Sequence, residues 1–583
     1  MNLTNLVTAG FRPAREDAAP APTSNRDLAT LFWSTAAILL AFPLFAQFGV
    51  LLCFTAGWPV SPVVAPAALL LSLAAGDWLL RREGMRGLRR IAPPAITLGI
   101  LGVSFGLSAA FLDMSWDGLW YHQTAIYQMA HGWNPLRDPM HAFIPSLQDY
   151  VRHYAKGPWY VSLAIFKIIP NIEWAKPSPW MALAAMFLAV AAAALEFGMR
   201  RRDAVLIGTL VSFNPVVLCE LASYLVDGLM ISYLACYVSA VAAGFRRPGL
   251  LLQGVALASA VLCINSKFSA IVFLCFFCAA LGAYLLIRRR RLVLRFAAIQ
   301  LATMVLAIGA FGYNPYVTNT IERGHPFYPW LGTARYPSYA QRGRDPNDMY
   351  ETPKNLLGHN RLFRFYYAMF GRPGAQPFYQ GPNAHLMLPF DVTWKDFEIF
   401  YFHEVRISGF GPLFSGAFLI SLALLAAALI RPGVAREIVL LSLAAVVASL
   451  LIGLHMWWAR YGPQLWWLPV IAVIAGLAVP GWRAVRWTAW GLAALLLVNA
   501  TLVGVAHFRW EIQSTRTTYQ QMALLRPKGE IEIDFQYFLE PFGERLRAGG
   551  VAFRPSRKLH CANPIELMSV AHGYPGVVRA CVP

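Results

Sequence analysis

The sequence predicts an all-α polytopic membrane protein with about thirteen transmembrane helices. Of its 583 residues, 57% are hydrophobic and only 14% are charged, and the mean hydropathy is +0.48. A soluble domain carries about 25% charged residues. Apolar runs of about 20 residues, the length that an α-helix needs to cross a bilayer, recur along the whole chain.

The apolar runs alternate with short polar connectors. One further run, 158–172, is only about fifteen residues long and is too short to cross a bilayer, so we expect an interfacial helix at the outer membrane surface there. The predicted spans are 29–52, 60–80, 92–112, 179–198, 203–223, 226–245, 249–267, 269–287, 293–313, 409–430, 437–455, 463–481 and 486–507.

Arginine-rich connectors set the predicted orientation, because cytoplasmic loops of membrane proteins carry an excess of Lys and Arg. If the N-terminus is cytoplasmic, every such connector falls in the cytoplasm. The net charge of +19 is then explained by these loops, and no nucleic-acid partner is expected. The connectors are 81–90, 200–202, 246–247, 288–291, 431–436 and 483–486.

The same orientation divides the chain into three parts. Residues 1–28 form a cytoplasmic tail, 29–507 a transmembrane module, and 508–583 a small extracytoplasmic C-terminal unit. Two long outer loops, 113–178 and 314–408, interrupt the module, and long loops are usually functional.

Two cysteines lie apart from the rest. Six of the eight cysteines fall in apolar runs, whereas Cys561 and Cys581 belong to the C-terminal unit. If this unit faces an oxidising compartment, the two thiols could pair as a disulfide.

Ionisable residues gather at the predicted outer ends of the spans, where they are costly and tend to mark function. A carboxylate there can act as a general base, and cations beside it suit a phosphate group. A base, several cations and an apolar surround together indicate a phosphate carried on a lipid. The residues are Asp113, Asp117, His122, His153, Lys156, Asp227, Lys267, Glu322, Arg323, His325, Glu404, Arg406, His455, Arg460 and Tyr461.

Individual members of this set also have structural interpretations. Asp113 or Asp117 can cap a helix end, and the cations Lys267 and Arg460 can snorkel toward the lipid headgroups. Four tryptophans are most simply an aromatic belt at the membrane surface. They are Trp116, Trp120, Trp457 and Trp458.

The topology and the stretch "SWDGLWY" (115–121) resemble the GT-C superfamily of integral membrane glycosyltransferases, which includes lipid A aminoarabinose transferases and protein O-mannosyltransferases. The aminoarabinose-transferase branch has an Asp–Glu pair with a Tyr four residues after the Asp. Asp117 and Tyr121 match this pattern, and Gly118 replaces the Glu. Asp227 matches the acid of the next outer turn, and Lys267 matches the Lys of the turn after it.

A second motif of that branch is matched only in part. Its Glu-Lys-Pro corresponds to "AKGP" here, which keeps Lys156 but has Ala155 in place of the Glu. In the relatives this Glu helps to hold a metal. Because Ala155 cannot take that part, no metal ligand is assigned here, and a divalent metal stays open as a cofactor.

The resemblance implies an inverting glycosyltransferase that moves a sugar from a polyprenyl-phosphate donor, such as undecaprenyl phosphate, to a lipid, glycan or protein acceptor. The reaction would take place on the extracytoplasmic face of a bacterial inner membrane, with Asp117 as general base. The candidates for substrate binding are Tyr121, His122, Asp227 and His325, and those for donor phosphate binding are Lys156, Lys267 and Arg460.

Two other functions stay open at this point. An O-antigen-type polymerase or ligase also joins lipid-linked glycans, and it would use Arg323, His325 and Arg406 of the second outer loop. A transporter or flippase would show internal repeats and ionisable groups near the middle of the membrane. The first-loop acid favours GT-C over the polymerase, and the position of the charges at the span ends disfavours a transporter.

Overall fold

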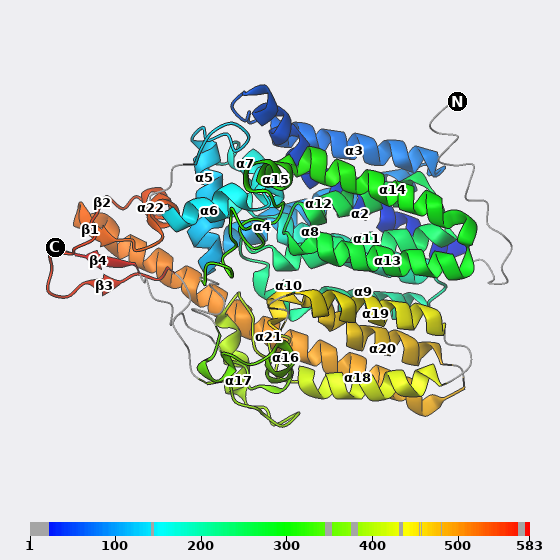
Figure 1. The fold of residues 1–583 in the computed structure, drawn as a ribbon. Helices are drawn as coiled ribbons and strands as arrows, with labels where there is room; N and C mark the ends of the chain where they lie inside the picture. Colours follow the sequence, from blue (N-terminus) through cyan, green and yellow to red (C-terminus); the bar gives the residue numbers. More distant parts are fainter. Residues whose placement is uncertain are drawn as a thin grey trace.

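The computed structural model describes residues 23–140, 145–343, 352–374, 383–430, 435–453, 455, 457–479, 481–569 and 578–582. Most of the predicted cytoplasmic tail, residues 1–22, lies outside this part of the chain. The described residues are mostly helical, and eight helices are long and apolar enough to cross a membrane. The long helices run side by side in a bundle that carries a small sheet at one end (Figure 1).

The larger part of the bundle is built around α2, which packs against α3, α4, α8 and α12. The bounds of its helices are α2 (Thr23–Ala56), α3 (Val64–Arg82), α4 (Leu88–Ala110), α8 (Ser178–Glu196), α9 (Arg201–Ser212), α10 (Pro215–Glu220), α11 (Asp227–Arg246), α12 (Leu250–Ile264), α13 (Ser269–Arg288), and α14 (Val293–Val305) with its continuation η4 (Leu306–Phe311).

A second group of long helices, in the lower half of Figure 1, packs against the first mainly through α13 and α19. Its bounds are α18 (Phe414–Leu429), α19 (Arg436–Ile452), α20 (Trp467–Ala478) and α21 (Arg483–Leu525). Short helices occupy the loops. They are η1 (Gly118–His122), α5 (Gln123–Ala130), α6 (Pro145–His153), α7 (Gly157–Phe166), η2 (Glu173–Ala175), η3 (Arg290–Leu292), η5 (Tyr313–Val317), α15 (Thr318–Arg323), η7 (Lys354–Leu356), α16 (Arg361–Phe370), α17 (Trp394–Glu398), η8 (Ile399–Tyr401), η9 (Ala459–Tyr461), η10 (Pro463–Trp466) and η11 (Arg526–Lys528).

Apolar side chains cover the outside of the long helices. On α14, for example, Leu294, Leu301 and Val305 are 84%, 65% and 63% exposed. Large apolar surfaces of this kind are unfavourable in water and favourable against lipid tails. The exposed faces therefore suit a polytopic membrane protein.

Ion pairs bring the arginine-rich connectors together at one end of the bundle, here called the arginine end. Arg247, between α11 and α12, pairs with Glu83 before α4 and with Glu196 at the end of α8. Arg288, at the end of α13, pairs with Glu437 at the start of α19. The opposite end, here called the loop end, carries α5, α6, α7, α15, α16 and α17 (Figure 1).

Helices occupy each of the thirteen predicted spans, but two of them differ from the prediction. The predicted span 203–223 is divided into α9 and α10 around Asn214–Pro215, because proline ends the hydrogen bonding of the preceding helix. The predicted last span ended at 507, whereas α21 continues to Leu525. Thirteen crossings stay a prediction, since eight described helices meet the length and hydropathy that a crossing requires.

The short apolar run of the first outer loop is not a surface helix. The structure forms α7 there, and its residues from Trp159 to Ile165 are buried. α7 packs against α2 and α5 inside the protein. An interfacial helix would keep one polar face toward water, which α7 lacks.

The C-terminal unit is not all-α. Its four strands form one sheet in the order β2–β1–β4–β3, with β1 parallel to β2 and antiparallel to β4. The bounds are β1 (Ile531–Asp534), α22 (Leu539–Ala548), β2 (Phe553–Pro555), β3 (Ile565–Glu566) and β4 (Arg579–Cys581). The prediction of an entirely helical chain was therefore wrong for this unit.

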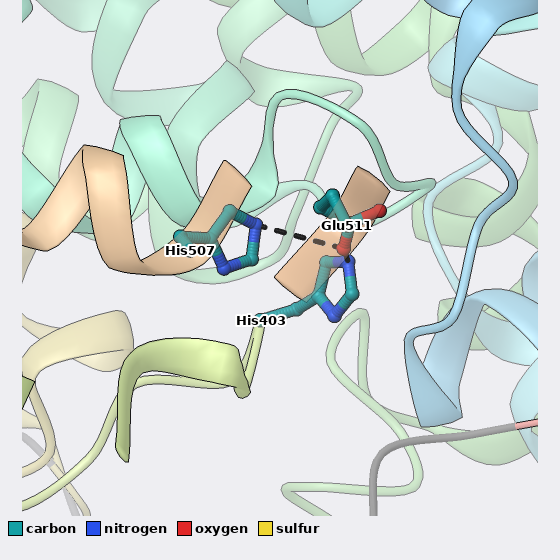
Figure 2. Close-up of side chains that lie close together, drawn as sticks. All are labelled: His403, His507 and Glu511. Atoms are coloured by element: carbon teal, nitrogen blue, oxygen red, sulfur yellow. Dashed lines mark ion pairs between the residues drawn. The ribbon is translucent and has the colours of Figure 1, made fainter. Parts of the chain in front are cut away.

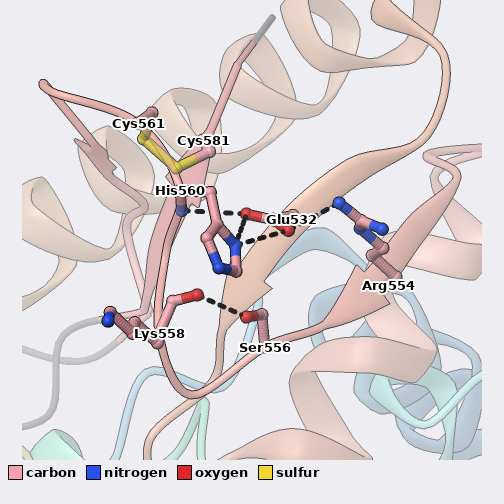
Figure 3. Close-up of a disulfide and its surroundings, with 7 residues drawn as sticks. All are labelled: Glu532, Arg554, Ser556, Lys558, His560, Cys561 and Cys581. Carbon is pink, nitrogen blue, oxygen red and sulfur yellow. Dashed lines mark hydrogen bonds and ion pairs between the residues drawn. A yellow bond between two sulfur atoms is a disulfide. The ribbon is translucent and has the colours of Figure 1, made fainter.

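A disulfide in the C-terminal unit joins the segment between β2 and β3 to the inner strand β4. Cys561 and Cys581 are joined, with a Cα–Cα distance of 5.7 Å (Figure 3). Beside them Glu532 of β1 accepts from the His560 backbone and pairs with Arg554. These bonds tie the loop after β2 to the middle of the sheet.

Candidate active site

Five charged side chains from distant parts of the chain meet at the loop end around Arg460. Its Nη2 lies 2.7 Å from Asp117 Oδ2, its Nη1 lies 3.0 Å from Glu404 Oε2, and its Nε lies 3.3 Å from Asp227 Oδ2. A guanidinium can serve three carboxylates because its N–H donors point in several directions within one plane. Lys267 pairs with Asp227 from the other side.

Local backbone geometry holds each charge in place. Asp227 is the first residue of α11, and Lys267 lies in the turn between α12 and α13. Arg460 is held beside Glu404 because its backbone N–H donates to Val405 O at 3.1 Å. The Asp117 backbone N–H faces Glu404 Oε1 at 3.5 Å.

Aromatic rings cover the cations of this cluster. The Lys267 ammonium lies 4.4 Å from the centroid of the Tyr461 ring, and the Arg460 guanidinium lies 5.1 Å from it. Tyr461 in turn stacks on Trp458 at 5.2 Å, and Arg406 covers Trp458 at 4.8 Å. Ring faces attract cations and lower the cost of removing them from water.

Asp117 is the most accessible carboxylate of the cluster. Its side chain is 18% exposed, compared with 4% for Glu404 and 1% for Asp227. Oδ2 is bound by Arg460, while Oδ1 makes no ion pair or hydrogen bond within the described residues. One oxygen is thus oriented and the other is open to a ligand, which suits a general base.

Asp113 has a structural role and not a catalytic one. Its Oδ1 accepts from the backbone and hydroxyl of Ser115, and its Oδ2 accepts from Gln123 Nε2 and the Tyr224 backbone. The side chain is fully buried. These four hydrogen bonds fix the turn that presents Asp117.

Gly118 lies against this turn. A Cβ placed on it would lie 2.0 Å from Asp113 Oδ2 and 2.3 Å from Ser115 Oγ. Any side chain at this position would displace the carboxylate that orders the turn. The absence of a side chain at Gly118 therefore leaves room for the buried carboxylate of Asp113.

Aromatic residues and a neutral histidine line one side of the cluster. Trp159 Nε1 donates to His122 Nδ1 at 2.7 Å, so the proton of His122 resides on Nε2. Burial lowers the pKa of His122 to about 3, with a further contribution from Arg460. Its Nε2 is buried and has no hydrogen-bond partner among the described residues. Tyr121 packs on the His122 ring at 4.2 Å.

Two carboxylates of this region were not among the predicted site residues. Glu404 bridges Arg460 and Arg406, the latter at 3.1 Å. Glu220, at the end of α10, is 1% exposed and accepts from the Gly228 backbone at 2.7 Å. Glu404 stood among the ionisable residues at the span ends, whereas Glu220 fell inside an apolar run that hid it.

Lys156 and His325 are not part of the charged cluster. The Lys156 ammonium donates to the carbonyls of Arg152 and Tyr154 at 2.8 and 2.9 Å, and its side chain is buried. Burial, together with Arg152, holds the pKa of Lys156 well below its usual range. His325 Nδ1 accepts from the Phe327 backbone in a local turn.

Of the residues considered for a polymerase or ligase, the structure brings only Arg406 to the cluster. Arg323 lies instead over the rings of Tyr328 and Tyr336, at 5.4 and 5.2 Å. Arg323 and His325 therefore do not join Arg460, and the polymerase or ligase stays an untested alternative.

The predicted aromatic belt was wrong for three of its four members. Trp116, Trp457 and Trp458 are 5%, 3% and 0% exposed. Trp116 packs edge-on against Phe538 of the C-terminal unit at 4.9 Å. These rings are core residues of the loop end and do not lie at a membrane surface.

A small pocket opens beside the cluster. Glu404 and Arg406 line it together with Phe400, Phe402 and Gly409. Its volume of about 20 Å³ admits about one water molecule and is too small for a sugar ring.

The sequence matches no protein-family model and no curated protein. Among solved structures, the chain is similar to the crystal structure of ArnT from Cupriavidus metallidurans bound to undecaprenyl phosphate. The two share 14% identity, and the similarity covers 83% of this chain and 96% of that chain with a TM-score of 0.42.

Proposed function

We propose that this chain is an inverting membrane glycosyltransferase that uses a polyprenyl-phosphate sugar as donor. The observation that carries the proposal is the convergence of Asp117, with one open carboxylate oxygen, on Arg460 and Lys267 at the loop end of an apolar bundle. A base beside cations, at the boundary of lipid and water, is what transfer from a lipid phosphate requires.

In the proposed reaction Asp117 takes the proton of an acceptor hydroxyl. The hydroxyl oxygen attacks the anomeric carbon from the side opposite the phosphate, and the bond between that carbon and the phosphate oxygen breaks. The polyprenyl phosphate leaves with the bonding electrons. Lys267 and Arg460 stabilise the negative charge that develops on it.

The charge balance of the cluster favours Lys267 as the first contact of the phosphate. Three carboxylates (Asp117, Asp227 and Glu404) face three cations (Lys267, Arg460 and Arg406). Lys267 is 13% exposed, whereas Arg460 is 5% exposed and already serves three partners. An entering phosphate would draw Lys267 away from Asp227 and share Arg460.

The neighbouring polar atoms suit the sugar. We assign the unpaired Nε2–H of His122 to a sugar hydroxyl, with Tyr121 beside it and Asp227 as an acceptor. Lys156 is bound to backbone carbonyls, so we assign it to holding the turn before α7 and not to the phosphate. His325 accepts from the Phe327 backbone in a local turn, so we do not assign it to the sugar.

The proposed location is a bacterial inner membrane, with the arginine end in the cytoplasm. The loop end and the C-terminal unit then face the periplasm, where the Cys561–Cys581 disulfide is stable. The acceptor is a lipid or glycan that reaches the same face.

The test is Asp117→Asn, which keeps the size of the side chain and removes its basicity. Transfer of sugar from a polyprenyl-phosphate donor by the purified protein should fall by about 10²- to 10⁴-fold, the usual contribution of a general base. Donor binding should change little. Asp391→Asn, on an exposed side chain of the second outer loop, is the matched control and should retain activity.

Transfer by Asp117→Asn at the wild-type rate would show that Asp117 is not the base. If the wild-type protein bound polyprenyl phosphate but transferred no sugar, the proposal that this chain is a glycosyltransferase would be contradicted.

A further inference from the structure

A second buried cluster joins the second outer loop to α21. It consists of His403, which follows η8, and of His507 and Glu511, which lie one helical turn apart on α21 (Figure 2). Their side chains are 1%, 0% and 0% exposed. His403 Nε2 lies 2.7 Å from Glu511 Oε1, and His507 Nε2 lies 3.7 Å from the same oxygen.

Several polar atoms of this cluster lack hydrogen bonds. His403 Nδ1 and Glu511 Oε2 are buried without a hydrogen-bond partner among the described residues, and His403 Nε2, His507 Nε2 and Glu511 Oε1 face only one another. Each buried polar atom left unbonded costs free energy. So many within one cluster indicate a partner that is not a protein atom.

The orientation of His507 suits a metal ligand. Its Nδ1 lies 2.8 Å from the Phe400 carbonyl and donates to it, which leaves the lone pair of Nε2 pointing at Glu511. Metal-binding histidines typically donate their second nitrogen to a carbonyl or carboxylate in this way.

The spacing of the ligand atoms also suits a small divalent ion. Ligands about 2.0–2.1 Å from a tetrahedral zinc ion lie about 3.3 Å apart. Here the two histidine nitrogens lie 2.7 and 3.7 Å from Glu511 Oε1, and all three ligand atoms lie within 4.8 Å of one another, so small side-chain shifts would seat the ion. With both rings neutral, the set carries the single negative charge of Glu511. A divalent cation would compensate this buried charge.

We propose that His403, His507 and Glu511 bind a divalent transition metal of the zinc class. Two imidazoles and one carboxylate are a common zinc ligand set that leaves one coordination position open. The ion would fasten the loop at His403 to α21. Because Glu404 is the next residue, the metal would also position the carboxylate that holds Arg460.

Metal binding to the purified full-length protein tests this proposal. After removal of bound metal, the wild-type protein should take up about one Co²⁺ per chain with the visible absorption of tetrahedral cobalt, and Zn²⁺ should displace it. His507→Gln and Glu511→Gln should each weaken Zn²⁺ binding at least about tenfold. His131→Gln, an exposed histidine of the first outer loop, is the matched control and should bind as the wild type does.

A measurement on the wild type alone covers the case in which a variant does not fold. Zn²⁺ added to the metal-free wild-type protein should raise its Tm, because a ligand that binds only the folded state stabilises it. No uptake of Co²⁺ or Zn²⁺ by the wild type, or equal uptake by His507→Gln and Glu511→Gln, would overturn the proposal. None of these measurements depends on glycosyl transfer.

Discussion

The absence of a side chain at Gly118 determines which conformation the active-site turn can adopt. It follows Asp117 directly, and its missing side chain leaves room for the carboxylate of Asp113. The chain therefore has one acid on the surface of the turn and one inside it. A second acid at position 118 would require a different turn.

We expect Gly118→Ala to destabilise the protein by about 1–3 kcal/mol, the usual cost of overpacking a tight site. Glycosyl transfer should fall as well, because Asp117 loses its position. Thermal unfolding of the purified protein in detergent measures the first effect. Gly102→Ala on α4 is the control, since a Cβ there meets nothing within 4 Å and alanine favours a helix.

An unchanged Tm for Gly118→Ala would mean that the turn around Asp113 adapts freely. The steric explanation for the glycine would then fail.

The sequence predicted four members of the charged cluster for a physical reason. Ionisable groups at the ends of apolar runs are costly to bury, so they tend to be kept for a function. The four are Asp117, Asp227, Lys267 and Arg460. Glu404 stood among the ionisable residues at the span ends but received no role in the predicted site. That Arg460 joins three carboxylates depends on tertiary contacts that no spacing along the chain reveals.

At the scale of elements, hydropathy located the long helices but not all of their ends. α21 continues past 507 with a polar second half, one face of which, including Glu511, packs against protein. The strands of the C-terminal unit are two to four residues long, too short for an alternating pattern to be visible.

The contact between α22 and α5 should depend on pH. Glu540 of α22 accepts from Gln128 of α5 at 2.6 Å, and burial raises the pKa of Glu540 to about 7, partly opposed by that hydrogen bond. The folded state thus binds the proton more tightly than the unfolded chain does. The contribution of Glu540 to the free energy of unfolding is fully present below pH 4.5, and it is lost as the pH rises through about 7.

Between pH 5.5 and pH 8.5 the Tm of the wild type should therefore fall more than that of Glu540→Gln, which cannot ionise. Glu530→Gln, an exposed neighbour in the same unit, should behave as the wild type does. Identical pH profiles for the wild type and Glu540→Gln would contradict this assignment.

At the scale of the whole molecule, the arginine end and the loop end lie at opposite ends of the bundle. The sequence predicted this separation, because arginine connectors and polar span ends alternate along the chain. The Arg247–Glu83 ion pair joins connectors at the arginine end, and the Arg460–Asp117 ion pair joins polar span ends at the loop end. Which end faces the cytoplasm stays a prediction.

Cysteine labelling in spheroplasts tests the orientation. In a chain whose six free cysteines are replaced by serine, a membrane-impermeant maleimide should label Lys528→Cys at the loop end. Arg86→Cys at the arginine end should be labelled only after the membrane is permeabilised. The opposite pattern would invert the assignment of the two faces.

The ion pair between Asp117 and Arg460 also has a consequence for synthesis. The two residues are 343 positions apart, so at roughly 5–20 residues per second the ribosome adds Arg460 on the order of 20–70 seconds after Asp117. During that interval the carboxylate lacks its guanidinium partner, and the unit that packs on Trp116 does not yet exist. A prematurely terminated chain can therefore hold most of the membrane helices and still have no assembled centre.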